Sequence, residues 1–415
     1  MTTHQVTRIF LILTVTRWLP SGMGIGVFTL WALERGLSPA QITAYLAFQG
    51  IGVLLLELPT SGFADGFGYK PVLLVAALIN VGTALLYLRA DSFTGFALAA
   101  FSMGVYRALD SGPLEAWAVD RLHELDPRAD ADQLLAKEST LVGLAIAGSA
   151  LAAGLLAAWH PFTAQSALLL PMLVLLGTTV VHLLATWLLL PTDRSVQPGA
   201  ALASVRGTPA AVASCLRLLR TDRVLAGIVA VELFWVAAMS VFETFQPIRL
   251  AELLGGAERA GAWVGPTASA GWGCFAIGAA LVGRSARRIG VARAAILARI
   301  LNGLGAAVMG LAYGPAGLIG AYLVTYGLHG ACGPVHRALL HRRAPQGSRA
   351  TVLSLNSLVA LGASAAIGPL LGQLAAYAGT QVAMVAGGLF SVLGALCYLP
   401  ALSAEKKDSS ASVVR

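Results

Sequence analysis

The stretch "ELPTSGFADGFGYK", from Glu57 to Lys70, closes one apolar run and opens the next. Leucines precede it, and Pro59 and three glycines then interrupt the apolar pattern. A short glycine-rich segment that carries Asp65 and Lys70 between two apolar runs is typical of a turn between membrane-spanning helices. The rest of the chain decides whether this interpretation holds.

The composition points to a membrane protein. Hydrophobic residues make up 57% of the 415 residues and charged residues only 12%, whereas soluble domains carry about 25% charged residues. The net charge of +8 does not indicate nucleic-acid binding, because the basic residues fall between apolar runs rather than on one soluble module. The four cysteines show no CxxC spacing, so we predict no disulfide framework, no metal site and no cofactor.

Twelve apolar segments are long enough to cross a bilayer, which takes about 20 residues each. They are 8–33, 39–63, 71–89, 93–118, 137–158, 164–190, 224–249, 260–282, 292–312, 315–339, 350–376 and 379–401. We therefore predict an all-α integral membrane protein with twelve transmembrane helices in two pseudo-symmetric six-helix bundles. The predicted parts are an N-terminal bundle (1–190), a cytoplasmic linker with a surface helix (191–223), a C-terminal bundle (224–402) and a polar cytoplasmic tail (403–415).

The basic residues predict the orientation of the chain. Of the 28 lysines and arginines, 21 fall on the side of the N-terminus, four fall on the opposite side and three lie inside spans. Because cytoplasmic loops carry an excess of Lys and Arg, we expect both termini in the cytoplasm.

An internal repeat supports the division into two halves. A shift of 222 residues places "GYKPVLLVAALIN", from Gly68 to Asn80, on "GVARAAILARILN", from Gly290 to Asn302. With a slip of one residue, "YRALDSGPLEA" at 106–116 faces "YGLHGACGPVHRA" at 326–338. Repeated halves are an architecture of secondary transporters, whose substrate site lies near the membrane midplane between the repeats. The repeat predicts that span four lies beside span one, and span ten beside span seven.

The opening stretch resembles the signature loop of the major facilitator superfamily, G-x-L-A-D-R-x-G-R-K. The matching residues are Gly62, Ala64, Asp65, Gly68 and Lys70. Phe63 replaces the leucine of the motif, Gly66 its first arginine and Tyr69 its second. The resemblance implies a cytoplasmic gate motif in which Asp65 contacts the start of span eleven, near Arg349.

Further stretches narrow the resemblance to one branch. "RATVLSLNSL" at 349–358 and "GPLLG" at 368–372 are similar to the eleventh span of drug exporters of the superfamily. "ELPTSGFAD" at 57–65 and "DSGPLEAWAVD" at 110–120 resemble a bacterial drug or metabolite efflux branch. The resemblance implies a permease that works as an efflux antiporter in the bacterial cytoplasmic (inner) membrane.

Charged residues inside the spans are the candidates for the transport site, because burying a charge in a bilayer is costly and marks function. They are Arg17, Glu57, Arg107, Asp110 and Glu232. By depth, Arg17 and Glu57 are placed to pair, and Arg107 and Asp110 are three residues apart on one helix face. Structural ion pairs that only orient the bundle are the alternative.

Asp110 is the candidate for proton coupling by depth, since it lies about 15 Å from the cytoplasmic end of span four at 1.5 Å per residue. We expect Glu115 to lie near the headgroups and to be solvated. For His182 and His329, a proton relay and a plain hydrogen bond to a neighbouring helix both remain open.

The expected function is secondary active transport of a small organic molecule by alternating access, with proton-coupled efflux as the first interpretation. The alternatives are a proton-coupled uptake symporter and a non-transporting sensor or scaffold on the same fold. A membrane-embedded zinc protease or a fused ATPase is disfavoured, because the sequence has neither an HExxH pair nor a GxxxxGK[ST] loop. The expected partners are the substrate, protons and lipid but no nucleic acid, with the chain as a monomer and not an enzyme.

Overall fold

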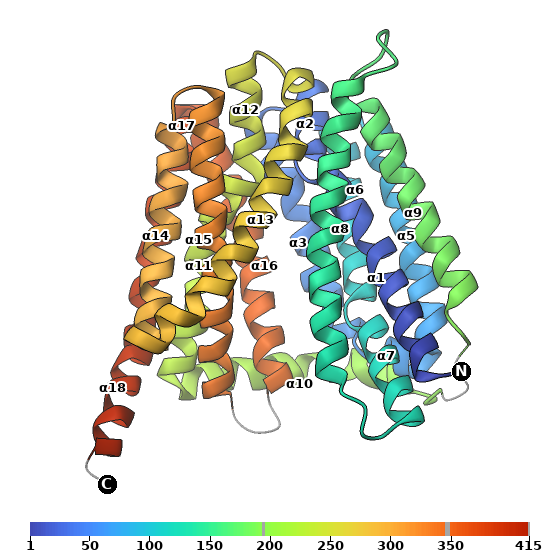
Figure 1. The fold of residues 1–415 in the computed structure, drawn as a ribbon, viewed down its shortest axis with the longest axis vertical. Helices are drawn as coiled ribbons and strands as arrows, with labels where there is room; N and C mark the ends of the chain where they lie inside the picture. The colour runs from blue at the N-terminus through green and yellow to red at the C-terminus, as the bar shows by residue number, and fades with distance from the viewer. Residues whose placement is uncertain (193–195, 345–348, 414–415) are drawn as a thin grey trace. The chain divides into compact units, whose positions relative to one another are not determined.

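The computed structural model describes residues 1–192, 196–344 and 349–413, with the backbone alone for residues 215, 349–351 and 407–413. All regular secondary structure in these residues is helical (Figure 1). The chain forms two compact units. Unit 1 comprises Met1–Arg35, Phe48–Pro209 and Gly261–Ser269, and unit 2 comprises Gly36–Ala47, Ala210–Ala260 and Ala270–Arg415.

The helices follow one another with short connections. The first nine are α1 (Thr3–Gly24), α2 (Val27–Glu34), α3 (Pro39–Thr60), α4 (Phe63–Phe67), α5 (Tyr69–Arg89), α6 (Phe93–Asp110), α7 (Pro113–Leu125), α8 (Ala131–Trp159) and α9 (Leu169–Leu189). The others are α10 (Ala200–Thr221), α11 (Arg223–Ser240), the π-helix η1 (Val241–Phe245), α12 (Gln246–Leu254), α13 (Ala257–Ile289), α14 (Val291–Leu311), α15 (Gly314–Arg343), α16 (Arg349–Ala378), α17 (Thr380–Leu393), the 3-10 helix η2 (Gly394–Tyr398) and α18 (Leu399–Val413).

Nine helical segments of the described chain are long and apolar enough to cross a membrane. They correspond to nine of the twelve predicted spans, which makes the protein a multi-pass membrane protein. The other three predicted spans fall on α6 with α7, on α13 and on α15. These helices carry more polar residues, such as Arg107 and Asp110 in α6 and His329 in α15, and this lowers their hydropathy.

The first predicted repeat pair matches in helix geometry. The helices α5 and α14 both have 21 residues, and their start positions differ by the predicted shift of 222. Each begins after a glycine in an unusual conformation, with φ 90° at Gly68 and φ 89° at Gly290. Only glycine adopts such angles without strain. Asn80 and Asn302, at corresponding places in the two helices, are both buried.

Each unit is held together by its own apolar packing. In unit 1, α1 packs against α7, α8 and α9, and one buried cluster joins Phe10 and Leu13 of α1 to Leu114 and Trp117 of α7. In unit 2, α11 packs against α16 and α17, and α14 packs against α15 and α17. Because α1 and α7 share a core, the residues next to Leu13 and Leu114 are held close together.

The linker predicted to hold a surface helix contains the 22-residue helix α10. It is followed directly by α11, whose N-cap is Asp222. The Asp222 Oδ1 atom accepts hydrogen bonds from the backbone N–H groups of Val224 (2.9 Å) and Leu225 (3.1 Å), and its Oδ2 accepts one from Arg343 Nε (2.6 Å). Burial alone would raise the pKa of Asp222, but the hydrogen bonds from Arg343 and the two backbone groups lower it below its ordinary value.

This cap is expected to contribute to stability in a pH-dependent way. Asp222→Ala should lower the stability of unit 2 by about 1 kcal/mol, as loss of an N-cap does. Since the pKa of Asp222 is lowered by folding, the contribution of its charge is present above the unfolded pKa of about 3.9 and is lost as the pH falls through the folded value. The difference in thermal unfolding between the wild type and Asp222→Asn should therefore be larger at pH 7 than at pH 3. An equal difference at both pH values would refute the assignment.

Candidate functional site

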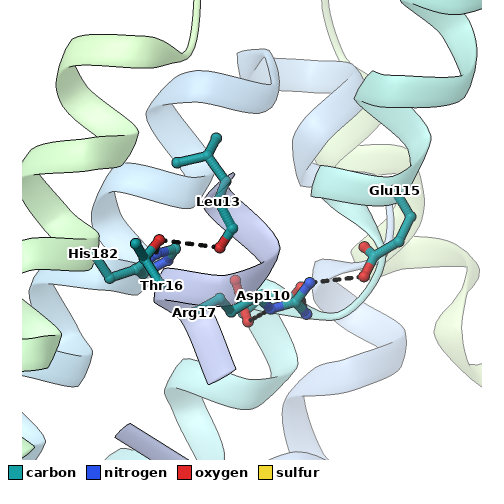
Figure 2. Close-up of polar contacts among 6 residues, drawn as sticks. All are labelled: Leu13, Thr16, Arg17, Asp110, Glu115 and His182. Carbon is teal, nitrogen blue, oxygen red and sulfur yellow. Dashed lines mark hydrogen bonds and ion pairs between the residues drawn. The ribbon is translucent and has the colours of Figure 1, made fainter. Parts of the chain in front are cut away.

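A buried arginine in unit 1 binds two carboxylates from α6 and α7 (Figure 2). Arg17 of α1 is 8% exposed. Its Nε donates to Asp110 Oδ2 at 2.5 Å, and its Nη1 donates to Glu115 Oε1 at 2.7 Å. Its Nη2 donates to the backbone carbonyl of Asp110 at 2.8 Å. All three nitrogen atoms of the guanidinium group therefore have a partner.

A helix break brings the two acids to one guanidinium. Asp110 is the last residue of α6, and Glu115 lies in the first turn of α7. Gly112 between them has φ 96°, and Pro113 begins α7. The end of a helix leaves backbone carbonyls without intrahelical partners, and Arg17 satisfies the one on Asp110. The break thus supplies both a carboxylate and a carbonyl to the same arginine.

The observed pairs differ from the predicted ones. Arg17 pairs with Asp110 and Glu115 rather than with Glu57. Arg107 is exposed, and within the described residues it forms no ion pair shorter than 4.0 Å. Asp110 binds the buried guanidinium of Arg17 on α1 instead of pairing with Arg107 on its own helix. The prediction that Glu115 is solvated is also wrong, because its side chain is 29% exposed and ion-paired.

Further acidic residues lie near Arg17 and Arg107. Glu115 Oε2 is shielded from solvent and has no hydrogen-bond partner among the described residues. Glu138, on α8, lies close to Glu115, and Glu57 lies close to Arg107. Four carboxyl groups and two guanidinium groups form this unit 1 cluster: Glu57, Asp110, Glu115 and Glu138 with Arg17 and Arg107. Fully ionised, the cluster would carry two unbalanced negative charges.

His182 lies beside the cluster on α9. Its Nδ1 is 3.0 Å from the hydroxyl of Thr16, which also donates to the carbonyl of Leu13 (Figure 2). His182 is only 3% exposed. Of the two interpretations left open by the sequence, this contact matches the hydrogen bond to a neighbouring helix.

Unit 2 contains a second buried ionic group around Glu232 of α11. His336 Nε2 of α15 lies 3.0 Å from Glu232 Oε1, and Asn356 Nδ2 donates to the same oxygen at 3.2 Å. The other ring nitrogen of His336 is 2.7 Å from the hydroxyl of Tyr398. Arg299 Nη2 of α14 lies 3.9 Å from Glu232 Oε1. His336 Nε2 also lies 3.0 Å from Asn356 Oδ1.

Most of this second group could not be predicted from the sequence. Glu232 was a candidate, but its partners Arg299 and His336 could not be predicted because they come from α14 and α15. The signal was present in the repeat: with the one-residue slip, Glu115 of "SGPLEA" corresponds to His336 of "CGPVHRA". In both units this position pairs with the first long helix, as Glu115–Arg17 in unit 1 and His336–Glu232 in unit 2. The predicted neighbours, span four beside span one and span ten beside span seven, are confirmed by these pairs.

The signature loop contacts the linker. Gly62 N donates to Ser204 Oγ at 3.1 Å, and the carbonyl of Asp65 accepts from Gln197 N at 2.8 Å. The side chain of Asp65 is exposed and Lys70 is half-buried in the first turn of α5. The predicted partner Arg349 begins α16, but its side chain and residues 345–348 lie outside the described residues. The contact between Asp65 and Arg349 therefore stays a prediction.

Known proteins resemble the chain in fold. A solved structure of the nucleoside transporter NupG superposes with a TM-score of 0.77 at 12% identity, covering 95% of this chain and 98% of that one. A bacterial homologue of the iron transporter ferroportin in an inward-facing state gives 0.72 at 16% identity, with 96% and 99% covered. A POT family transporter in complex with 5-aminolevulinic acid gives 0.69 at 13%, with 96% and 95% covered.

At these identities the likeness shows the fold alone, and the comparison with curated proteins finds no match. The sequence pattern that describes the Major Facilitator Superfamily, however, matches residues 10–361, which is most of the chain. A match over this length, on a helical membrane protein with a signature loop between its second and third spans, establishes the family. The chain is a membrane transporter that belongs to the Major Facilitator Superfamily.

Proposed function

We propose that the protein is a secondary active transporter that exports a small organic molecule in exchange for protons by alternating access. The observation that supports this most is the unit 1 cluster, in which carboxyl groups outnumber guanidinium groups on membrane-spanning helices. A group that changes charge during the cycle is what proton coupling requires. The efflux direction follows the resemblance of "ELPTSGFAD" and "DSGPLEAWAVD" to exporters.

Asp110 is the proposed proton carrier. When Asp110 binds a proton, the ionic contact from Arg17 Nε to Oδ2 weakens, while the bonds to the Asp110 carbonyl and to Glu115 hold the guanidinium in place. Glu115 then remains as the counter-ion of Arg17, and the side chain of Asp110 is free to rotate. Release of the proton restores the short contact. The cycle thus has two arrangements of one buried cluster, each with its charges paired.

The experiment that tests the function is a transport panel in a bacterial strain that lacks its own exporters. Cells that make the protein should retain less of at least one small organic compound than cells with an empty vector. Greater retention of a compound would instead identify the uptake symporter. No change for any compound, with the protein present in the membrane, would favour the sensor or scaffold.

We also propose the finer topology: twelve spans in two six-helix bundles, residues 191–223 as the cytoplasmic linker, and both termini in the cytoplasm of the bacterial inner membrane. In this proposal α6 with α7, α13 and α15 cross the membrane, since α13 has 33 residues and α15 has 30. The loop with Gly62, Asp65, Gly68 and Lys70 then serves as the cytoplasmic gate motif.

Reporter fusions test this topology. Because of the charge bias of the loops, alkaline phosphatase fused after Pro191 or after Ser403 should be inactive, and green fluorescent protein at the same points should be fluorescent. A fusion after Arg35, on the predicted outer side, serves as the control with the opposite pattern. Phosphatase activity at either Pro191 or Ser403 would contradict the twelve-span proposal.

A further inference from the structure

Unit 2 gathers aromatic side chains from three helices and the π-helix around one histidine. The ring of His329 on α15 stacks on Trp235 of α11, with centroids 5.4 Å apart and planes at 18°. Phe242 of η1 lies 5.0 Å from the same ring, Phe275 of α13 lies 5.3 Å away and Tyr326 of α15 lies 5.7 Å away. We call these five side chains the aromatic cluster.

Two further rings extend the cluster. Trp272 lies 5.3 Å from Phe275 and 6.1 Å from Tyr326, and Tyr322 lies 5.0 Å from Tyr326. The hydroxyl of Tyr326 donates to Glu243 Oε1 at 2.7 Å. A carboxylate thus lies at the edge of a continuous set of π-surfaces.

The cluster differs from an ordinary aromatic core in two respects. Phe242 and Tyr326 are buried, but Trp235, Trp272, Phe275 and His329 keep part of their surface exposed. Buried indole N–H groups and ring nitrogens normally have hydrogen-bond partners. Here Trp235 Nε1, Trp272 Nε1 and His329 Nδ1 are shielded from solvent and have no partner among the described residues.

The backbone is irregular at the same place. The π-helix Val241–Phe245 interrupts the run from α11 to α12. Such a bulge adds a residue to one helical turn and is frequent at functional sites. It carries both Phe242, which contacts His329, and Glu243, which contacts Tyr326.

The charges around the cluster favour a basic ligand. Glu243 accepts a hydrogen bond from Tyr326 and has no ion-pair partner within 4.0 Å in the part of the chain that the structure describes. The guanidinium of Arg299 lies 5.1 Å from the Trp235 ring, but Glu232 offsets its charge at 3.9 Å. The local balance is therefore negative, and aromatic faces attract cations in addition.

From this arrangement we propose that unit 2 carries a binding site for a planar aromatic weak base. The ligand ring packs against the exposed surfaces of Trp235, His329 and Phe275, and its positive nitrogen faces Glu243. The ligand class rests on the proposed transport function, because it names the substrate that this transporter would export. Binding itself is measurable without transport.

The test uses 9-aminoacridine, a planar aromatic weak base, and equilibrium dialysis against the purified full-length protein in lipid nanodiscs. We expect saturable binding beyond that of empty nanodiscs. Trp235→Leu should weaken it by about tenfold, as loss of a stacking ring does, and Glu243→Gln by a similar factor. Tyr326→Phe, which keeps the ring and loses only the hydroxyl, should have a smaller effect. Trp187→Leu is the matched control, since Trp187 lies on α9 of unit 1 and is 58% exposed, and it should bind as the wild type does.

Competitors separate the two features of the ligand. Neither octylamine, a cation without a ring, nor 2-naphthoate, an aromatic anion, should displace 9-aminoacridine at equal concentration. Wild-type affinity in both Trp235→Leu and Glu243→Gln would overturn the site, and so would absence of saturable binding or equal competition by octylamine. Size-exclusion profiles identical to the wild type establish that the variants are folded.

Transport measured in parallel separates the site from the function. Saturable binding that depends on Trp235 and Glu243, without movement of 9-aminoacridine into vesicles, would support the site and contradict the proposed export. Movement that is unchanged in Trp235→Leu would contradict the site and leave export standing.

Discussion

Replacement of Arg17 by leucine is expected to abolish transport and to lower the free energy of unfolding by about 3–5 kcal/mol, which is the usual cost of removing one partner of a buried ion pair. Arg17 is the only observed ion-pair partner within 4.0 Å of Asp110 and Glu115 among the described residues, and it also satisfies the carbonyl of Asp110. Without it, two carboxylates are left in the membrane with no direct counter-ion. Thermal unfolding in detergent and uptake into vesicles measure the two effects.

A control and a rescue separate this effect from general damage. Arg128→Leu makes the same exchange at an exposed residue between α7 and α8 and should leave stability within about 0.5 kcal/mol of the wild type. The double variant Arg17→Leu/Asp110→Asn should be more stable than Arg17→Leu alone, because one of the two unpaired charges is gone. A double variant that is less stable than Arg17→Leu would show that the pair is not the source of the loss.

Asp110→Asn is expected to remove coupling while keeping the fold. The asparagine oxygen can still accept from Arg17 Nε, and the bonds from Arg17 to the backbone carbonyl and to Glu115 remain available. The side chain can no longer exchange a proton. A gradient of one pH unit supplies about 1.4 kcal/mol per proton, enough for about tenfold accumulation of a substrate exchanged one for one. Vesicles with the variant should show no accumulation but should still exchange substrate across the membrane.

Neutralising a different acid provides the control. Glu124→Gln removes a carboxylate that is 56% exposed and pairs with Arg121 on the same helix. Vesicles with this variant should accumulate substrate as the wild type does. Accumulation by Asp110→Asn at the wild-type ratio would exclude Asp110 as the carrier. Glu115 and Glu138 would then be the next acids to test, because they lie together beside Arg17.

The sequence was sufficient for the features that depend on local pattern. Apolar length predicted nine of the spans that the structure contains, and the repeat predicted that α5 and α14 begin at equivalent glycines. Both features follow from periodicity and from the backbone angles that Gly68 and Gly290 adopt. The three spans that fall short, α6 with α7, α13 and α15, have a lower hydropathy than the nine, so hydropathy alone describes them poorly.

The sequence did not predict which residues of different helices contact one another. Helical spacing predicted that Arg107 pairs with Asp110. In the structure Asp110 pairs with Arg17 of α1 instead. That contact depends on how α1 crosses α6 and α7 at the break after Asp110, which a linear pattern does not contain. His336 and the aromatic cluster were missed for the same reason. The signal for the aromatic cluster was the spacing of Tyr322, Tyr326 and His329 along one face of α15, and the signal for His336 was its place in the repeat.

Proton-driven transport through the unit 1 cluster can be measured in vesicles that contain only the purified protein and a substrate identified by the panel. With a pH gradient imposed, the wild type should concentrate the substrate, and collapse of the gradient by a protonophore should release it to equal concentrations within the same experiment. Substrate addition without a gradient should move protons in the opposite direction, and Asp110→Asn should show neither effect. Accumulation that survives collapse of the gradient, or substrate movement with no proton movement in the wild type, would contradict proton-driven transport.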